Sequence, residues 1–238
     1  RLAFDELFSH QLSLSIARNK IKGSKGRANI STGIMQTNVL KQLSFDFTED
    51  QKHSIKDILD DLKKPERMNR LLQGDVGSGK TIVAFIGIIA AVEAGGQGAI
   101  MAPTEILARQ HFETLSPLAK KVGVSLNLLT GRDKGTARNK KLIDLKEGKT
   151  NIIIGTHALF QADVVFKDLR LAVVDEQHRF GVRQRLELGK KGSVVDLLLM
   201  TATPIPRSLA LAHYGDMDFS IIKQKPPGRK PINTALIS

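Results

Sequence analysis

The fold of this chain is decided by residues 70–81, which read RLLQGDVGSGKT. The last eight letters fit the phosphate-binding pattern G-x-x-x-x-G-K-[ST] without a mismatch. That pattern needs glycines that let backbone N–H groups turn toward anionic oxygens, a lysine for the β- and γ-phosphates, and a hydroxyl for Mg²⁺. The residues that fill this predicted phosphate and Mg²⁺ site are Gly74, Gly77, Ser78, Gly79, Lys80 and Thr81.

The segments on either side of the loop suit this reading. A short apolar strand is expected over residues 70–73, and residues 82–92 are apolar on every side of a helix, which predicts a buried helix. The N-terminus of that helix would add the positive end of its dipole to the phosphate site. A glycine-rich turn before an ordinary core helix is the plain alternative, and the number of matched positions disfavours it.

Composition narrows the class of protein. The 238 residues carry 36 Lys and Arg against 24 Asp and Glu, a net charge of +12, which favours a polyanionic partner such as nucleic acid. Charge that serves only solubility is a serious competitor. The absence of cysteine excludes disulfides and thiolate metal sites. No apolar run is long enough to cross a membrane and no secretory signal is visible, so a cytoplasmic protein is expected.

After the loop, apolar strands alternate with helical segments, which is typical of a parallel α/β sheet. Strands are predicted over residues 70–73, 98–102, 125–129, 151–154, 169–174, 195–200 and 219–222. Helices are predicted over residues 1–19, 51–62, 82–92, 104–122, 136–147, 183–189 and 205–214, with Thr48 or Asp50 as the cap of the second.

Three regions are expected along the chain. Residues 1–44 read as a leading helix followed by a flexible linker, because residues 18–33 are basic, rich in glycine and free of acidic side chains. Residues 45–224 read as one α/β domain. Residues 225–238 begin with KPPGRKP, which cannot continue a helix or a central strand and reads as an exit linker.

Two carboxylates follow the predicted strand that ends at Val174. Open α/β sheets bind ligands at the carboxyl ends of their strands, and the phosphate loop opens at that same edge. Asp175 is therefore expected to hold hydrated Mg²⁺, together with Thr81, while Glu176 orients and deprotonates the attacking water. An Asp-Glu pair after a strand more often caps a helix, but the phosphate loop on the same edge favours catalysis.

At this point the sequence resembles the superfamily 2 helicases, which are P-loop NTPases with RecA-like domains, and among them the helicases that branch-migrate DNA. The motor of transcription-repair coupling translocases is the nearest rival, and Ser78 with residues 68–73 looks less like it. Segments similar to motifs I, Ia, Ib, Ic, II and III occur in that order at residues 74–81, 102–108, 130–131, 155–159, 175–182 and 201–207.

The resemblance implies roles for further residues. Phe45 and Gln51 would bind the adenine, although spacing alone makes Gln51 a solvated helix residue. The catalytic set would be Lys80, Asp175, Glu176, Gln177 and His178. The residues that pass the nucleotide state to the DNA surface would be Gln177, His178, Thr201 and Thr203. The contacts to the DNA phosphate backbone would be Thr104, Arg109, Gly131 and Thr156.

The family also implies the activity and the partners. The chain would be the first RecA-like domain of an ATP- and Mg²⁺-dependent DNA helicase that remodels branched or forked DNA in repair and recombination. A second RecA-like domain and an upstream wedge domain would belong to the same protein. A regulatory ATPase switch that does not translocate, and a plain nucleic-acid-binding module, are the alternatives from other classes.

Overall fold

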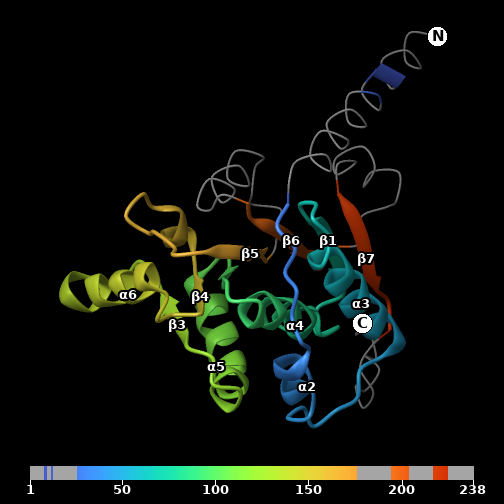
Figure 1. The fold of residues 1–238 in the computed structure, drawn as a ribbon, viewed down its shortest axis with the longest axis horizontal. Helices are drawn as coiled ribbons and strands as arrows, with labels where there is room; N and C mark the ends of the chain where they lie inside the picture. The colour runs from blue at the N-terminus through green and yellow to red at the C-terminus, as the bar shows by residue number, and fades with distance from the viewer. Residues whose placement is uncertain (1–7, 10–11, 13–25, 176–193, 204–216, 225–238) are drawn as a thin grey trace, which may run out of the picture.

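The computed structural model describes residues 8–9, 12, 26–175, 194–203 and 217–224. In this part of the chain a single sheet runs in the order β3-β4-β2-β5-β6-β1-β7, and every paired strand is parallel (Figure 1). All seven predicted strands are confirmed to within two residues at each end. They are β1 Asn69–Gly74, β2 Gln97–Met101, β3 Leu126–Leu129, β4 Ile152–Gly155, β5 Leu169–Val174, β6 Asp196–Thr201 and β7 Asp218–Ile222.

Helices cover both faces of the sheet. The core on one face is built from α2, α3, α4 and α5, and the core on the other face includes side chains of α6 and of the short 3₁₀ helix η1. The predicted class, a parallel α/β sheet with helices on both faces, is therefore confirmed. The helices are α2 Ile34–Leu40, α3 Glu49–Leu62, α4 Lys80–Glu93, α5 Glu105–Lys121, α6 Gly135–Glu147 and η1 His157–Phe160.

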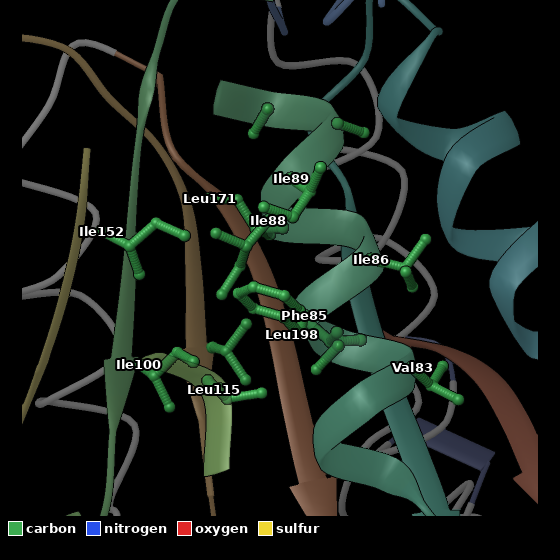
Figure 2. Close-up of a cluster of buried hydrophobic side chains, with 14 of the residues drawn as sticks. Val83, Phe85, Ile86, Ile88, Ile89, Ile100, Leu115, Ile152, Leu171 and Leu198 are labelled. Atoms are coloured by element: carbon green, nitrogen blue, oxygen red, sulfur yellow. The ribbon is translucent and has the colours of Figure 1, made fainter. Parts of the chain in front are cut away.

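The helix after the phosphate loop, α4, lies at the centre of the larger core. Every residue from position 83 to position 92 is buried, as the apolar sequence predicts. Figure 2 shows Ile88 and Phe85 pointing toward the sheet, where they meet side chains such as Leu171 and Leu198. Val83 and Ile86, which belong to the same core, lie on the opposite side of the helix in this view. Burial on both sides fixes the helix, and with it the loop from which it starts.

The described part of the predicted linker packs on the domain. The backbone N–H of Asn29 donates to the Leu62 carbonyl at 2.7 Å, and Asn29 is buried. The next element, α2, is a helix that the sequence does not predict. Its cap residue, Gly33, has no side chain, so Glu93 at the end of α4 accepts the N–H groups of Ile34 at 3.0 Å and Met35 at 3.2 Å. A cap supplied by so distant a residue leaves no local pattern.

Some predicted elements lie outside the described residues. These are most of the helix over residues 1–19, the helices over residues 183–189 and 205–214, and the exit linker over residues 225–238. The division of the chain into three regions stays a prediction. Within the described ranges, no helix has the length and apolar character needed to cross a bilayer.

The buried carboxyl of Asp196 connects the start of β6 to Asn29 and to Met68. Asp196 Oδ1 accepts from the Met68 N–H at 2.8 Å, and its Oδ2 accepts from Asn29 Nδ2 at 2.9 Å. Burial raises the pKa of Asp196 to about 7, and the hydrogen bond from the Met68 N–H opposes that rise only in part. The folded chain therefore holds a proton that the unfolded chain releases near pH 4.

This proton predicts a pH-dependent stability. Below pH 4 both states carry the proton, and between about pH 4 and 7 only the folded state does, so Asp196 lowers the free energy of unfolding as pH rises through that window. Between pH 5 and 8 the expected loss is roughly 2 to 3 kcal/mol. Urea unfolding should show this loss in the parent, and Asp196→Asn should remove it.

The matched control is Asp60→Asn, which removes an exposed carboxyl on α3. That variant should keep the parent's pH dependence. Identical pH dependence in Asp196→Asn and the parent would contradict the assignment of the proton to Asp196.

Candidate nucleotide-binding site

Three predicted site segments meet at one edge of the sheet. The strands β1, β6 and β5 are neighbours in that order and end at Gly74, Thr201 and Val174. Because the strands are parallel, their carboxyl ends lie at the same edge. Two strand spacings, roughly 10 Å in total, separate β1 from β5. The phosphate loop and Asp175 are thus brought to one edge, as the sequence predicts, and Thr201 lies at that edge as well.

The backbone of the loop requires glycine at two positions. Gly77 has a φ of 76° and Gly79 a φ of 87°, in the left-handed region that other residues rarely adopt. At Gly79 a side chain would also overlap the Gln51 amide nitrogen. The Ser78 N–H donates to the Asp75 carbonyl at 3.0 Å, which closes the turn before α4 begins at Lys80.

The side chain of Lys80 is held inside the loop. Lys80 is 9% exposed, and its Nζ donates to the Gly74 carbonyl at 2.5 Å and the Asp75 carbonyl at 2.9 Å. These bonds place a positive charge beside the N-terminus of α4, where the helix dipole has the same sign. Both features favour an anion.

The residues present fit a phosphate and Mg²⁺. The buried Ser78 hydroxyl finds no hydrogen-bond partner among the described residues, so the loop has polar capacity that an incoming ligand can use. Thr81 is half-buried in the first turn of α4, and Asp175 lies at the end of β5. The described residues contain no cluster of three or more His, Asp or Glu side chains that could hold a metal. One hydroxyl and one carboxylate match Mg²⁺, which keeps several waters and binds phosphate oxygens.

Asp175 is fixed by its backbone and its side chain. Its N–H donates to the Met101 carbonyl at 2.8 Å, and its Oδ2 lies 2.7 Å from His111 Nε2. Sequence reasoning missed His111. Its signal is spacing, because the buried positions of α5 are Ala108, His111, Leu115 and Ala119, and a histidine on this otherwise apolar stripe calls for a partner.

The solvated position predicted for Gln51 from spacing is wrong. Gln51 is 1% exposed, and its side chain has two jobs. Its Oε1 accepts from the Thr48 N–H at 2.9 Å, which completes a capping box at the start of α3, and its Nε2 donates to the Ser78 carbonyl at 2.7 Å. Thr48, and not Asp50, is the cap. The amide is therefore fixed against the phosphate loop.

The structure describes the surroundings of both residues that are predicted to bind adenine, Phe45 and Gln51. Phe45 is 44% exposed and packs edge-on against Phe47, with ring centroids 5.9 Å apart. Gln51 keeps a second amide hydrogen and a second acceptor lone pair beyond the bonds above. The role of Phe45 and Gln51 in adenine binding stays a prediction.

The residues expected to couple nucleotide and DNA are described only in part. Thr201 is buried at the end of β6, its hydroxyl lies 3.0 Å from that of Thr203, and it accepts from the Thr203 N–H at 3.2 Å. The two threonines therefore form one hydrogen-bonded pair. The other predicted catalytic and coupling residues, Glu176, Gln177 and His178, lie outside the described part of the chain.

Three candidate DNA contacts share the other half of the same edge. Thr104 follows β2, Gly131 follows β3 and Thr156 follows β4, and these strands are adjacent in the order β3-β4-β2. A side chain at Gly131 would meet nothing within 4 Å, so its backbone is open to an approaching strand. The fourth candidate, Arg109, is exposed and pairs with Glu105 at 2.8 Å.

Known proteins resemble the chain at three levels. Residues 48–211 match the model of the DEAD/DEAH box helicase family. The ATP-dependent DNA helicase RecG of Streptococcus pneumoniae is 50% identical over 239 residues, which cover 100% of this chain and 35% of that protein. RecG of Thermotoga maritima is 46% identical over 100% of this chain and 30% of its own length. The chain thus spans about a third of these curated relatives.

Solved structures agree with these matches. A structure of RecG bound to a three-way DNA junction has a TM-score of 0.86 and 43% identity, covering 98% of this chain and 31% of that one. The DEAD-box helicase Mss116, at 21% identity and a TM-score of 0.62, covers 79% of this chain and 42% of its own and shares the fold. The phosphate loop, the Asp175 edge and these matches together show that the chain belongs to the DEAD/DEAH box helicase family and corresponds to the first, RecA-like motor domain of RecG helicases.

Proposed function

We propose that this chain is the ATP-binding motor domain of a DNA helicase that remodels branched DNA in repair and recombination. The observation that carries the proposal is the division of one sheet edge into two halves. Around β1, β6 and β5 lie the phosphate loop and Asp175, and around β2, β4 and β3 lie the candidate phosphate-backbone contacts. Because both halves belong to one sheet, a change in the nucleotide state can change the contacts that the other half makes with a DNA strand.

The nucleotide half binds and orients ATP. The backbone N–H groups around Gly77 and Gly79, with the Ser78 hydroxyl, would hold the phosphates, and Lys80 would add a charge-assisted contact to the β- and γ-phosphates. Thr81 and Asp175 would hold Mg²⁺, partly through water. Mg²⁺ supplies neutralisation of phosphate charge in such sites.

The chemical step belongs to the residue after Asp175. In the sequence Glu176 directly follows Asp175, which lies just after β5 at this edge of the sheet. Its carboxylate orients the attacking water and takes its proton. Gln177, His178, Thr201 and Thr203 would then exchange hydrogen bonds as the γ-phosphate leaves. The paired hydroxyls of Thr201 and Thr203 are suited to such an exchange, because each can donate or accept.

The DNA half contacts backbone phosphates. Small polar groups and open backbone at Thr104, Gly131 and Thr156 suit contacts that position a strand without reading its bases. Arg109 would exchange its pairing with Glu105 for a phosphate. The net charge of +12 supports a polyanionic partner. The RecG structure named above is bound to a three-way DNA junction, which supports a branched substrate for this chain too.

Further domains complete the proposed motor. The curated relatives are about three times as long as this chain. A second RecA-like domain would close on the nucleotide, and a wedge domain would engage the branch point. We place the protein in the cytoplasm, where a bacterial DNA motor meets its substrate.

The first test of this assignment is nucleotide binding. Lys80→Ala should weaken binding of Mg-ATP by about 10- to 100-fold, because a charge-assisted bond worth about 1.5 to 3 kcal/mol is lost. Titration calorimetry on the parent and the variant measures this difference. Lys120→Ala, which removes an exposed lysine near the end of α5, is the matched control and should bind like the parent. Equal affinity in Lys80→Ala and the parent would contradict the assignment of the nucleotide site to this loop.

A further inference from the structure

A buried histidine contacts the carboxylate proposed to hold the metal. His111 lies on α5, Asp175 follows β5, and their side chains are only 11% and 12% exposed. His111 Nε2 lies 2.7 Å from Asp175 Oδ2. A carboxylate can only accept hydrogen bonds, so Nε2 carries the hydrogen and donates it.

The position of His111 in its helix argues against a general packing role. The other buried residues on this face of α5 are Ala108, Leu115 and Ala119, all apolar. A polar ring among them costs free energy unless it is hydrogen-bonded. The bond to Asp175 is the contact that offsets this cost, so the ring is placed for the carboxylate.

The bond fixes an orientation that the backbone leaves open. The Asp175 N–H is held by the Met101 carbonyl, which sets the backbone but not the rotation of the carboxyl group. With Oδ2 held by His111, the rotation is set, and Oδ1 has a defined direction. Carboxylates that ligate metals are themselves usually hydrogen-bonded, and loss of such a partner typically costs about 10- to 100-fold in metal affinity.

We propose that His111 is the positioning residue for Asp175, which it orients toward the Mg²⁺ of the bound nucleotide. This inference rests on the proposed function, because it requires that Asp175 hold the metal. It adds a residue from α5, the helix that begins after Thr104, to the nucleotide half of the site. His111 acts through Asp175 and does not itself contact the nucleotide.

The test measures how ADP binding depends on Mg²⁺ in the full-length protein. Calorimetric titrations with ADP at a series of Mg²⁺ concentrations give the Mg²⁺ midpoint and the affinity without Mg²⁺. His111→Leu should raise the midpoint about tenfold or more and leave the Mg²⁺-free affinity unchanged. His111→Gln, whose amide nitrogen can reach the place of Nε2, should restore the midpoint to within about threefold.

Two further variants sharpen the test. His111→Asn carries the same amide on a shorter side chain that does not reach Asp175, so its midpoint should rise as in His111→Leu. The contrast between Asn and Gln serves if His111→Leu fails to fold, which thermal melting detects. Glu113→Gln, an exposed change two residues along α5, is the matched control and should match the parent.

The outcomes separate the inference from the function beneath it. ADP binding by the parent that ignores Mg²⁺ would overturn the metal site itself, and His111 positioning with it. A parent that requires Mg²⁺, beside His111→Leu and His111→Asn with the parent's midpoint, would overturn the positioning role alone. A midpoint raised equally in His111→Gln and His111→Asn would also overturn it, because a donor at that place would then have no effect.

Discussion

ATP hydrolysis by the full-length protein should fall by about 10²- to 10⁴-fold when Glu176 is replaced by glutamine, with nucleotide binding retained. The amide keeps the shape of the side chain, but it cannot take the proton of the attacking water. Steady-state turnover at saturating ATP measures the loss, and titration calorimetry measures the retained binding. The effect is large because general-base catalysis acts on the chemical step and not on affinity.

The same substitution at an exposed site provides the control. Glu113→Gln on α5 should hydrolyse ATP at the parent rate. A Glu176→Gln protein that turns over as fast as the parent would show that the general base lies elsewhere in the protein.

The second large effect concerns the domain that would close on the nucleotide. This chain alone should hydrolyse ATP about 10³- to 10⁵-fold more slowly than the full-length protein, because arginines supplied across a domain cleft stabilise the charge of the transition state by that factor. Steady-state turnover of the two proteins, under identical conditions, measures the ratio. The chain alone should still bind Mg-ATP, so calorimetry separates lost chemistry from lost binding.

The sequence predicted the inner strands well because they are buried on both faces. Such strands are mostly apolar runs, and β4, with three consecutive isoleucines, is buried at all four positions from Ile152 to Gly155. The phosphate loop was predictable for a different reason. Its function requires fixed residue types at fixed spacing, and positive φ angles at Gly77 and Gly79 are the backbone counterpart of that requirement.

The features that sequence reasoning missed depend on residues far apart in the chain. The start of α2 is capped by Glu93, about sixty positions later, so no local cap residue signals that helix. Gln51 was expected in solvent, yet it is buried because Ser78 offers it a carbonyl. In the same way, the hydrogen-bond partner of His111 is visible only in the fold, where Asp175, which follows β5, lies beside α5.

Three predicted catalytic and coupling residues lie outside the described part of the chain. They are Glu176, Gln177 and His178, and their roles stay predictions from the sequence and the family. Their proposed roles rest on their order after Asp175 and on the resemblance of residues 175–182 to a helicase motif. The strand order shows which predicted DNA contacts are neighbours, and sequence spacing alone could not show this. Thr104, Gly131 and Thr156 follow three adjacent strands.

ATP turnover with and without DNA tests whether this chain is one of the two RecA-like domains of an ATP-driven motor that DNA stimulates. Steady-state hydrolysis should be measured for the chain alone and for the full-length protein, each with and without a three-way DNA junction. The junction should accelerate ATP hydrolysis by the full-length protein, while hydrolysis by the chain alone should stay slow in both conditions. Turnover by the chain alone that equals that of the full-length protein, or full-length turnover that does not change with the junction, would contradict this assignment.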